Sequence, residues 1–294
     1  MTPHAPSADE LVGVELGGRY RLLQVLGSGG IGHVYLAQPL DAEGQPTVAV
    51  KVLRTELAHQ REAVARFERE ALAASRIRHE NVIEVHGPSG VHEGLRYFAM
   101  RLLVGIDLAD LLATSSRLAP GRAVRIALGA AAGLAASHAA GVIHRDVKPE
   151  NIFLEHRPDG QERPRVLDFG SAFLVGDATL APVERITTRA SVVGTPGYLS
   201  PEQAEGVLAH PAADVYALAV TLYEMLTGAP PYRGSSWLEL LHLHASEPIP
   251  ELRFVSSDLG SVLVQAMAKR PEERFRSVEA FARALAGVPE ARSR

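Results

Sequence analysis

Cysteine is absent from all 294 residues of the chain. Disulfide bonds and thiolate metal sites are therefore excluded, and this absence fits a reducing cytosol. No uncharged apolar run reaches the roughly 18 residues that a membrane-spanning helix needs. Residues 1–18 contain neither the basic nor the apolar region of a signal peptide. We therefore expect a cytoplasmic protein with no membrane segment.

An excess of basic charge is missing as well. Lys and Arg number 30 against 34 Asp and Glu, which gives a formal net charge of −4. Nothing in this balance indicates a nucleic-acid partner. Hydrophobic residues make up 46% and charged residues 22%, which are ordinary values for a globular protein. At 294 residues the chain exceeds the usual single domain, so one large two-part unit or two small domains are expected.

The apolar pattern changes about a third of the way along the chain. Up to Met100 it alternates in short runs between Gly- or Pro-containing turns, which predicts strands, with one helical run from Arg61 to Arg78. From Leu108 onward helical spacing dominates. The predicted strands are 20–26, 33–38, 47–53 and 96–100, and the predicted helices are 123–138, 214–227, 236–245, 259–269 and 277–286. We therefore expect an α+β chain, divided into a flexible leader (1–18), a β-rich lobe (19–100), a mainly helical lobe (101–286, joined through 101–105) and a tail (287–294).

The first motif is a glycine-rich segment from Gly27 to Val34 that matches G-x-G-x-x-G-x-V. A bare G-x-G-x-x-G is weak evidence, because a plain turn is a comparable reading. A dinucleotide-binding loop would open a helix, but the residues after these glycines alternate like a strand. A strand–loop–strand hairpin folded over phosphates is therefore favoured. Glycine suits it because a Cβ would block close approach of the backbone to phosphate oxygens.

A lysine on the next predicted strand and a glutamate on the following helix form a second constellation. Ala49 and Lys51 share one face of the strand, so Ala49 with Val34 can cover an adenine ring while Lys51 reaches the phosphates. An exposed strand lysine is the commoner alternative. Glu70 lies within the apolar stripe of the helix, where a carboxylate is costly unless it is paired. Lys51 is the available cation, and a solvated glutamate at the edge of the stripe is the alternative.

The most informative stretch runs from His144 to Asn151 and reads H-R-D-V-K-P-E-N. Two cations, two acids, an amide and a proline are unfavourable in both helix and strand, so a loop is predicted. A solvated polar turn is the alternative, but it would not require this order of residues. Asp168, in an Asp-Phe-Gly tripeptide 17 residues after Asn151, adds an oxygen donor of the kind that Mg²⁺ prefers.

Taken together, these motifs resemble the eukaryotic-type serine/threonine protein kinases, most closely their bacterial branch. The resemblance runs from about Arg19 to Ala286 and ends its series of motifs with G-T-P-x-Y-x-S-P-E over 194–202. It implies the bilobal protein kinase fold, with a small antiparallel β-rich N-lobe that carries one helix and a larger, mainly helical C-lobe. It also implies transfer of the γ-phosphoryl group of Mg²⁺-ATP to Ser and Thr hydroxyls of protein substrates.

The resemblance assigns a role to each matching residue. Asp146 orients the substrate hydroxyl and accepts its proton, and Lys148 neutralises charge on the γ-phosphoryl group. Asn151 and Asp168 hold Mg²⁺, while Lys51, anchored by the helix glutamate, holds the α- and β-phosphates. The residues that it implies around ATP are Leu26, Gly27, Gly29, Gly32, Val34, Ala49, Lys51, Met100, Leu103 and Phe153.

The polar, hydroxyl-rich segment over 171–200 is an ordinary surface loop or an activation loop. The resemblance favours an activation loop, because Arg145 precedes the catalytic aspartate. Thr187 and Thr188 lie where related bacterial kinases carry phosphates, and Arg145 is the expected clamp for them. Thr195 is instead expected to form hydrogen bonds beside the catalytic aspartate and lysine. Activation by autophosphorylation is expected, and reaction in trans within a homodimer is left open.

Two pairings and two alternatives complete the sequence-based account. Glu202 is expected to pair with Arg274, and Asp214 to hold the backbone of the catalytic loop. A nucleotide-binding pseudokinase that acts as a scaffold would usually lack the phosphate-binding lysine or one of the two catalytic aspartates, and all three are present. A small-molecule kinase would lack the peptide-docking segment over 194–202. The motif set therefore favours a non-specific serine/threonine protein kinase over both.

Overall fold

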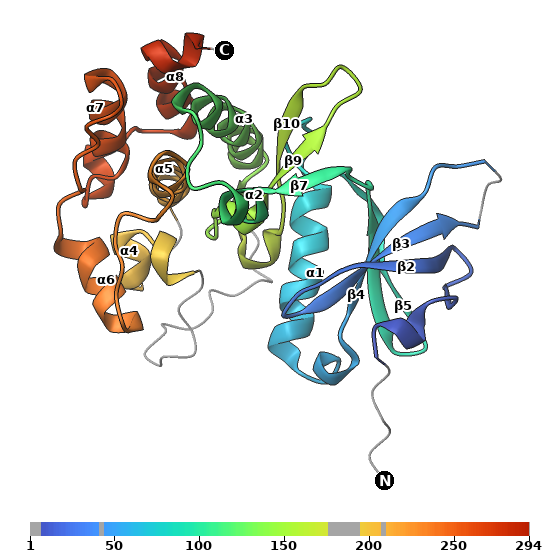
Figure 1. Cartoon of the computed structure of the whole chain (residues 1–294). Coiled ribbons are helices and arrows are strands. Elements are labelled where there is room, and N and C mark those ends of the chain that lie inside the picture. The colour runs from blue at the N-terminus through green and yellow to red at the C-terminus, as the bar shows by residue number, and fades with distance from the viewer. Residues whose placement is uncertain (1–6, 41–43, 176–194, 207–209, 294) are drawn as a thin grey trace. The chain divides into compact units, whose positions relative to one another are not determined.

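The computed structural model of the chain, drawn in Figure 1, describes residues 7–40, 44–175, 195–206 and 210–293. The chain falls into two compact units. The first contains the residues up to 78 together with 83–104, and the second contains 79–82 together with the residues from 105 onward. The predicted change from strands to helices along the chain is confirmed.

The first unit is built on one antiparallel sheet of six strands in the order β1-β2-β3-β4-β6-β5. Strands form where β-branched and aromatic residues alternate with smaller or polar ones, and a helix, α1, follows β4. The bounds are β1 Glu15–Leu16, β2 Tyr20–Ser28, β3 Gly32–Pro39, β4 Val48–Leu53, α1 Arg61–Ser75, β5 Val85–His92 and β6 Leu95–Met100, with 3-10 turns at Asp9–Leu11 and Thr55–Leu57.

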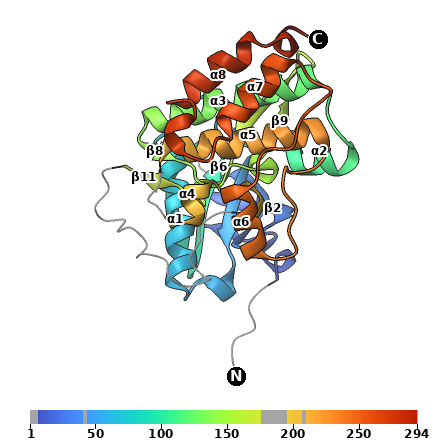
Figure 2. The same ribbon diagram turned by 90° about the vertical axis from the view of Figure 1, so that its left-hand side faces the viewer.

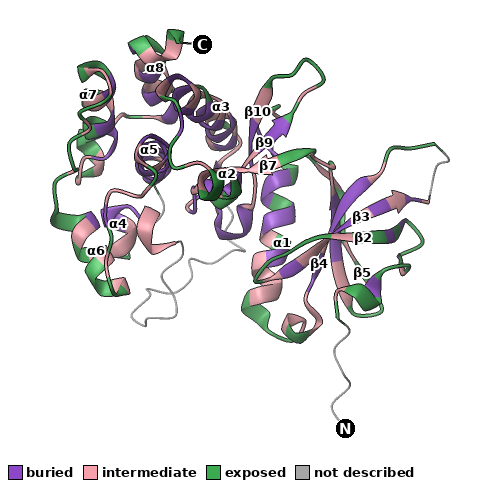
Figure 3. Ribbon diagram, in the orientation of Figure 1, coloured by how far each residue is buried: buried purple, intermediate pink, exposed green. Residues whose placement is uncertain are grey.

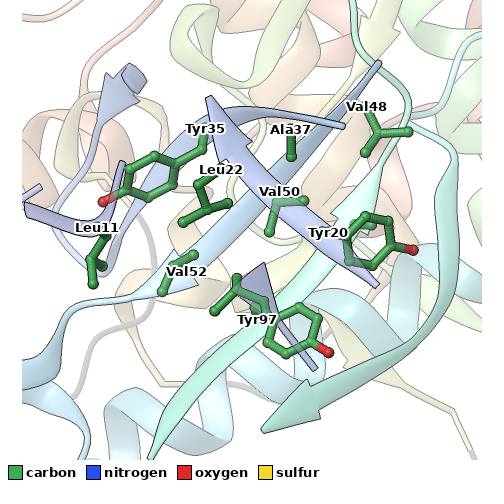
Figure 4. Packing of buried hydrophobic residues seen from close by; sticks show 11 residues of the cluster. Leu11, Tyr20, Leu22, Tyr35, Ala37, Val48, Val50, Val52 and Tyr97 are labelled. Carbon is green, nitrogen blue, oxygen red and sulfur yellow. The ribbon is translucent and has the colours of Figure 1, made fainter. Parts of the chain in front are cut away.

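Neighbouring residues of this sheet supply two apolar clusters, one on each face. Tyr97 and Phe98 are adjacent on β6 and belong to different clusters. The Phe98 ring lies 5.1 Å from the ring of Phe67, so α1 covers one face. Tyr97 belongs to the cluster drawn in Figure 4, where Tyr35 and Val50 are also found. The sheet is therefore buried on both sides in its central part.

The N-terminal segment covers the face of the sheet opposite α1. Leu11 and Leu16 are buried in the cluster of Figure 4, and Tyr35 Oη donates a hydrogen bond to the Ala8 carbonyl oxygen at 2.9 Å. The expectation of a flexible leader over residues 1–18 is therefore wrong from Asp9 onward. Two leucines are too few to form a periodic pattern, and only the paired strands reveal the apolar face that they cover.

The second unit contains seven α-helices and two small sheets among its described residues. The helices are α2 Leu108–Thr114, α3 Pro120–Ala139, α4 Pro201–Ala204, α5 Pro211–Thr227, α6 Trp237–Ser246, α7 Ser257–Ala266 and α8 Val278–Gly287. The strands are β7 Gly105–Asp107, β9 Ile152–His156 and β10 Glu162–Val166 in one sheet, and β8 Val142–Ile143 with β11 Phe173–Leu174 in the other. Short 3-10 turns lie at Pro149–Asn151, Phe169–Ser171, Pro196–Tyr198, Pro271–Glu273 and Pro289–Arg292.

Helix α5 forms the core of this unit. It is apolar nearly all round, and α3, α7 and α8 pack against it, as Figures 1 and 2 show. Figure 3 colours α5 as buried along most of its length. The helix ends at Gly228, whose left-handed backbone (φ 81°) suits glycine, and a Cβ there would meet the Ser116 carbonyl oxygen at 1.8 Å. Such a buried helix can position polar groups of the loops that it contacts.

Over the described residues, no helix is both long enough and apolar enough to cross a membrane.

Candidate active site

The loop from His144 to Asn151 follows β8 and is fixed by a buried aspartate of α5. Asp214 is 0% exposed and accepts hydrogen bonds from the backbone N–H of His144 at 2.9 Å and of Arg145 at 2.8 Å. Its Oδ2 also lies 2.7 Å from His138 Nε2. The prediction that Asp214 holds the backbone of this loop is confirmed.

The charges around Asp214 explain how it is tolerated in the core. Burial would raise the pKa of Asp214, but the hydrogen bond and charge of His138 hold that pKa below its usual value. Burial would likewise lower the pKa of His138, but pairing with Asp214 raises it. Arg145 has a left-handed backbone (φ 70°), which is uncommon outside glycine. This strain is held because successive N–H groups converge on one carboxylate.

Asp146 and Lys148 of this loop form a connected polar group with Thr195, which lies later in the chain. Asp146 Oδ1 accepts hydrogen bonds from the Thr195 backbone N–H at 3.0 Å and from Thr195 Oγ1 at 3.1 Å. Lys148 Nζ lies 3.3 Å from Asp146 Oδ2 and donates to Thr195 Oγ1 at 2.5 Å. The predicted hydrogen bonds of Thr195 are confirmed. One carboxylate oxygen is oriented by threonine, and the other faces a cation.

The Asn151 side chain lies directly behind this group. Its Nδ2 donates to the Asp146 carbonyl oxygen at 2.8 Å, and the backbone carbonyl oxygen of Asn151 accepts from the Leu167 N–H at 2.9 Å. The second bond ties the residue before Asp168 to the loop. Asp168 is half-buried with a left-handed backbone (φ 51°), and its Oδ1 accepts from the Gly170 N–H at 3.0 Å. The two predicted metal-ligating residues therefore belong to one hydrogen-bonded framework.

The segment after Thr195 is anchored to the same framework. Glu202 and Arg274 form a buried ion pair with two contacts of 2.7 Å, which confirms the predicted pairing. Both guanidinium–carboxylate bonds are parallel donor–acceptor pairs, the geometry that arginine favours. Gln203 Nε2 donates to the Arg145 carbonyl oxygen at 2.9 Å. Helix α4 is therefore joined directly to the loop that carries Asp146.

In the first unit, Lys51 of β4 and Glu70 of α1 form a close ion pair. Lys51 Nζ lies 2.6 Å from both carboxylate oxygens of Glu70, and their side chains are only 14% and 8% exposed. The predicted pairing is confirmed. Loss of one partner from an ion pair this buried should be strongly destabilising, because the remaining charge would have neither a partner nor much solvent.

Strand register gathers the predicted adenine-covering residues on one face of this sheet. Val34 pairs across β3 and β4 with Lys51, and Ala49 pairs across β4 and β6 with Met100. Directly opposed residues point to the same face, and so do Ala49 and Lys51, which are two residues apart on β4. Val34, Ala49 and Met100 therefore form an apolar surface beside the lysine.

The glycines of the β2–β3 hairpin differ in whether the surrounding structure requires a residue without a Cβ. A Cβ at Gly32 would lie 2.5 Å from the Val52 carbonyl oxygen, so close packing against β4 requires glycine there. At Gly27 and Gly30 a Cβ would meet no atom within 4 Å, and at Gly29 only one at 3.7 Å. None of these three has a left-handed backbone. No contact within the unit therefore requires glycine at these three positions, and the open space beside them leaves the backbone accessible to phosphate oxygens.

The remaining predicted residues are distributed as follows. Leu26 is exposed at the end of β2, and Leu103 is half-buried near the end of the first unit. Phe153 belongs to the second unit, where it pairs with Asp107 of β7. Thr187 and Thr188 lie outside the described residues. The roles of these residues stay predictions.

Asn151 and Asp168 are the residues that could hold a metal ion. Asn151 supplies an amide oxygen and Asp168 supplies carboxylate oxygens, and Mg²⁺ prefers oxygen ligands of both kinds. Within the described chain, no group of three or more His, Asp or Glu residues could hold a metal by itself. The donor set therefore fits an ion that takes its other ligands from phosphate and water, as Mg²⁺ does with nucleotides.

The second unit contains a buried polar group around His244 that no sequence motif predicts. His244 on α6 is 0% exposed, its Nδ1 lies 2.8 Å from Tyr216 Oη, and its ring centroid lies 4.9 Å from that of Tyr232. Lys269 Nζ donates to the His244 carbonyl oxygen at 2.8 Å and to Tyr232 Oη at 3.0 Å. Burial, with the charge of Lys269, lowers the pKa of His244 to about 4.

His244 should make the stability of the protein depend on pH. The unfolded chain, with a histidine pKa of about 6.5, binds more protons than the folded one as pH falls toward 4. We expect the free energy of unfolding to fall over this interval by up to about 3 kcal/mol from this residue. Urea unfolding at several pH values should show a shallower fall for His244→Gln. His242→Gln, an exposed histidine of the same helix, is the matched control. Equal slopes in all three proteins would contradict the prediction.

Comparison with known proteins places these features in one family. The family model described as "Protein kinase domain" matches residues 20–285. Serine/threonine-protein kinase pkn3 of Myxococcus xanthus is 38% identical over 98% of this chain and 53% of its own length. Serine/threonine-protein kinase PkaB of Streptomyces coelicolor is 39% identical over 92% of this chain and 63% of its own. Serine/threonine-protein kinase PknB of Mycobacterium tuberculosis is 38% identical over 89% of this chain and 41% of its own length. This chain therefore spans about half the length of the relatives it matches.

Proposed function

The chain belongs to the protein kinase family, and we propose that it transfers the γ-phosphoryl group of Mg²⁺-ATP to serine and threonine hydroxyls of proteins. The observation that carries this proposal is the Asp146 carboxylate. One of its oxygens is held by Thr195 and the other lies 3.3 Å from Lys148 Nζ. This is the arrangement that a base next to a charge-neutralising cation needs.

Each part of the proposed reaction has a candidate residue. Asp146 accepts the proton of the substrate hydroxyl as the hydroxyl oxygen attacks the γ-phosphorus. The bond between the γ-phosphorus and the β–γ bridging oxygen breaks and ADP leaves, while Lys148 stabilises the negative charge on the transferred group. Asn151 and Asp168 hold Mg²⁺, which when bound neutralises charge on the phosphates. Lys51, kept in position by Glu70, binds the α- and β-phosphates.

The adenine end of ATP is assigned to apolar residues. Val34, Ala49 and Met100, which share one face of the first sheet, cover the base. Leu26 and Leu103, which belong to the same unit, are further candidates for contact with the base. Gly27 and Gly29 leave the backbone open to the phosphates, and Gly32 lets the hairpin pack closely against β4. A cytoplasmic location belongs to this proposal, because ATP is supplied there.

A nucleotide-binding pseudokinase is less well supported than an active enzyme. Lys51, Asp146 and Asp168 are all present, and the relatives named above are serine/threonine-protein kinases. The test is incubation of the purified chain with Mg²⁺, ATP labelled at the γ-position and a generic basic protein. Label should appear on serine or threonine, and a chelator should stop its transfer. ATP binding without any transfer would favour the scaffold.

Regulation by autophosphorylation is a second part of the proposal. A phosphate on Thr187 or Thr188 would add about −1.5 to −2 charges, and Arg145 is the proposed partner. The backbone of Arg145 is fixed by Asp214 and Gln203, so a contact to its side chain would act on the loop that carries Asp146. Such a contact can order a segment.

This regulation predicts phosphate on the pair Thr187 and Thr188 in the expressed protein, detected by mass spectrometry. Phosphatase treatment should lower activity, and so should replacement of both threonines by alanine, without loss of nucleotide binding. Reaction in trans would make the initial rate per molecule rise with protein concentration. Full activity of the unphosphorylated protein would remove the switch and leave the catalytic proposal intact.

A further inference from the structure

The tip of the glycine hairpin, residues 29–31, is hydrogen-bonded to one arginine at the end of the neighbouring strand. Arg54 directly follows β4 and is half-buried. Its backbone N–H donates to the Ile31 carbonyl oxygen at 3.0 Å, and its side-chain Nε donates to the Gly29 carbonyl oxygen at 3.0 Å. The two carbonyls at the ends of the tip are therefore held by the same residue.

A second fastening closes the base of the tip. Ser28 and His33 are direct partners in the β2–β3 register, and Ser28 Oγ lies 2.9 Å from His33 Nδ1. The Gly29 N–H donates to the Gly32 carbonyl oxygen at 2.8 Å within the same turn. Burial lowers the pKa of His33, the charge of Arg54 lowers it further, and the charge of Glu56 opposes them.

These bonds matter because the two glycines of the tip have almost no packing of their own, whereas Ile31 packs against the apolar cluster that contains Phe67. A Cβ at Gly30 would meet nothing within 4 Å, and one at Gly29 only the Gly32 carbonyl oxygen. Glycine also has the largest backbone freedom to lose when a conformation is fixed. Without the side-chain hydrogen bond of Arg54, the Gly29 carbonyl would lose its partner. The ligand would then have to order these glycines to a larger extent, and binding would weaken accordingly.

We propose that Arg54 is a positioning residue for the phosphates of ATP, acting by holding the carbonyls of Gly29 and Ile31 so that the tip is ordered before the nucleotide binds. The Ser28–His33 pair assists it. This inference rests on the proposed binding of ATP phosphates beneath the glycine hairpin. The side chain acts through a hydrogen bond from its guanidinium Nε to a carbonyl oxygen, and the role requires the donor at that position rather than the charge.

Two substitutions separate the hydrogen bond from the charge. Arg54→Gln removes the charge but keeps an N–H donor at the same distance along the side chain, whereas Arg54→Met keeps length and removes the donor. Loss of one such bond should raise KM for ATP by about 3- to 10-fold in Arg54→Met with kcat within about twofold. Arg54→Gln should stay within about twofold of the wild type in both. Arg21→Met, which removes an exposed arginine of the same sheet paired with Glu15, is the control.

A binding comparison tests whether the effect reaches the phosphates. Arg54→Met should weaken ADP binding by about 3- to 10-fold and leave adenosine binding within about twofold. Equal loss for ADP and adenosine would indicate general damage to the unit and overturn the proposal. So would an Arg54→Gln protein as impaired as Arg54→Met, because charge would then be the requirement. Unchanged ADP binding in Arg54→Met would overturn it as well.

Amide hydrogen exchange without nucleotide keeps this inference separate from the proposed function. The peptide covering the tip should exchange faster in Arg54→Met than in Arg54→Gln or the wild type, whatever the protein catalyses. If the wild type bound ADP no more tightly than adenosine, the proposed function would fail while the exchange result still judged the fastening. Identical exchange in all three proteins would refute the ordering role of Arg54.

Discussion

Replacing Asp146 by asparagine is expected to lower the rate of phosphoryl transfer by at least about 10²–10⁴-fold. Asparagine has nearly the same volume, and its Oδ1 can still accept the two hydrogen bonds from Thr195. It cannot take up the proton of the substrate hydroxyl. Its amide also no longer offers Lys148 the negative oxygen that now lies 3.3 Å away. The loss should therefore fall on kcat and leave the fold and nucleotide binding largely intact.

The measurement is steady-state kinetics with a Ser/Thr peptide, accompanied by thermal unfolding and ADP titration of both proteins. Asp159→Asn is the matched control, because Asp159 is exposed and pairs only with Arg157 and a nearby backbone N–H among the contacts given by the structure. It should keep full turnover. An Asp146→Asn protein with wild-type turnover would show that the base has been assigned to the wrong loop.

Replacing Lys51 by methionine is expected to cost about 10²–10³ in rate, the usual size for loss of an electrostatic contributor. Methionine keeps the bulk of the stem on β4 and removes the ammonium group. The surface made by Val34, Ala49 and Met100 does not depend on that charge. Adenosine should therefore bind almost as before, whereas ATP should be poorly positioned. Kinetics and binding of the two ligands provide the comparison.

A double-mutant cycle tests whether Lys51 and Glu70 act as one unit. Glu70→Ala alone should resemble Lys51→Met in a milder form, because the ammonium group loses both of its 2.6 Å contacts. The double mutant should be no worse than Lys51→Met. Glu68→Ala is the control on the same helix, since Glu68 pairs with Arg96 at a more exposed position. Fully additive losses would refute the coupling of Lys51 to Glu70.

Much of this site could be predicted from the sequence because its residues lie in short motifs. The Lys51–Glu70 pair, the Glu202–Arg274 pair and the hydrogen bonds of Thr195 are all found in the structure. The Lys51–Glu70 pair follows from a physical rule, since a carboxylate on an apolar face needs a partner, whereas the other two expectations came from the resemblance. The roles assigned to them come from resemblance, and they stay predictions until the variants are made.

Other features could not be predicted because they depend on contacts between residues far apart in sequence. The burial of Leu11 and Leu16 requires a sheet face that no local pattern describes. Arg54 contacts Gly29 across 25 positions, and His244 contacts Tyr216 across 28, with no periodicity to indicate either. The start of one helix differs from its predicted position for a local reason. Helix α5 begins at Pro211, because proline suits the first turn of a helix, rather than at Asp214.

The central claim is that this chain transfers phosphate and does more than bind nucleotide. The most direct measurement follows the γ-phosphoryl group itself, with labelled ATP, excess enzyme and a Ser/Thr peptide in a single turnover, followed by phosphoamino-acid analysis. Label should leave ATP and appear on phosphoserine or phosphothreonine in step with ADP formation, and Asp146→Asn should bind ATP without this transfer. ATP bound by the phosphorylated wild-type protein and recovered intact, with no label on the peptide, would contradict the central claim.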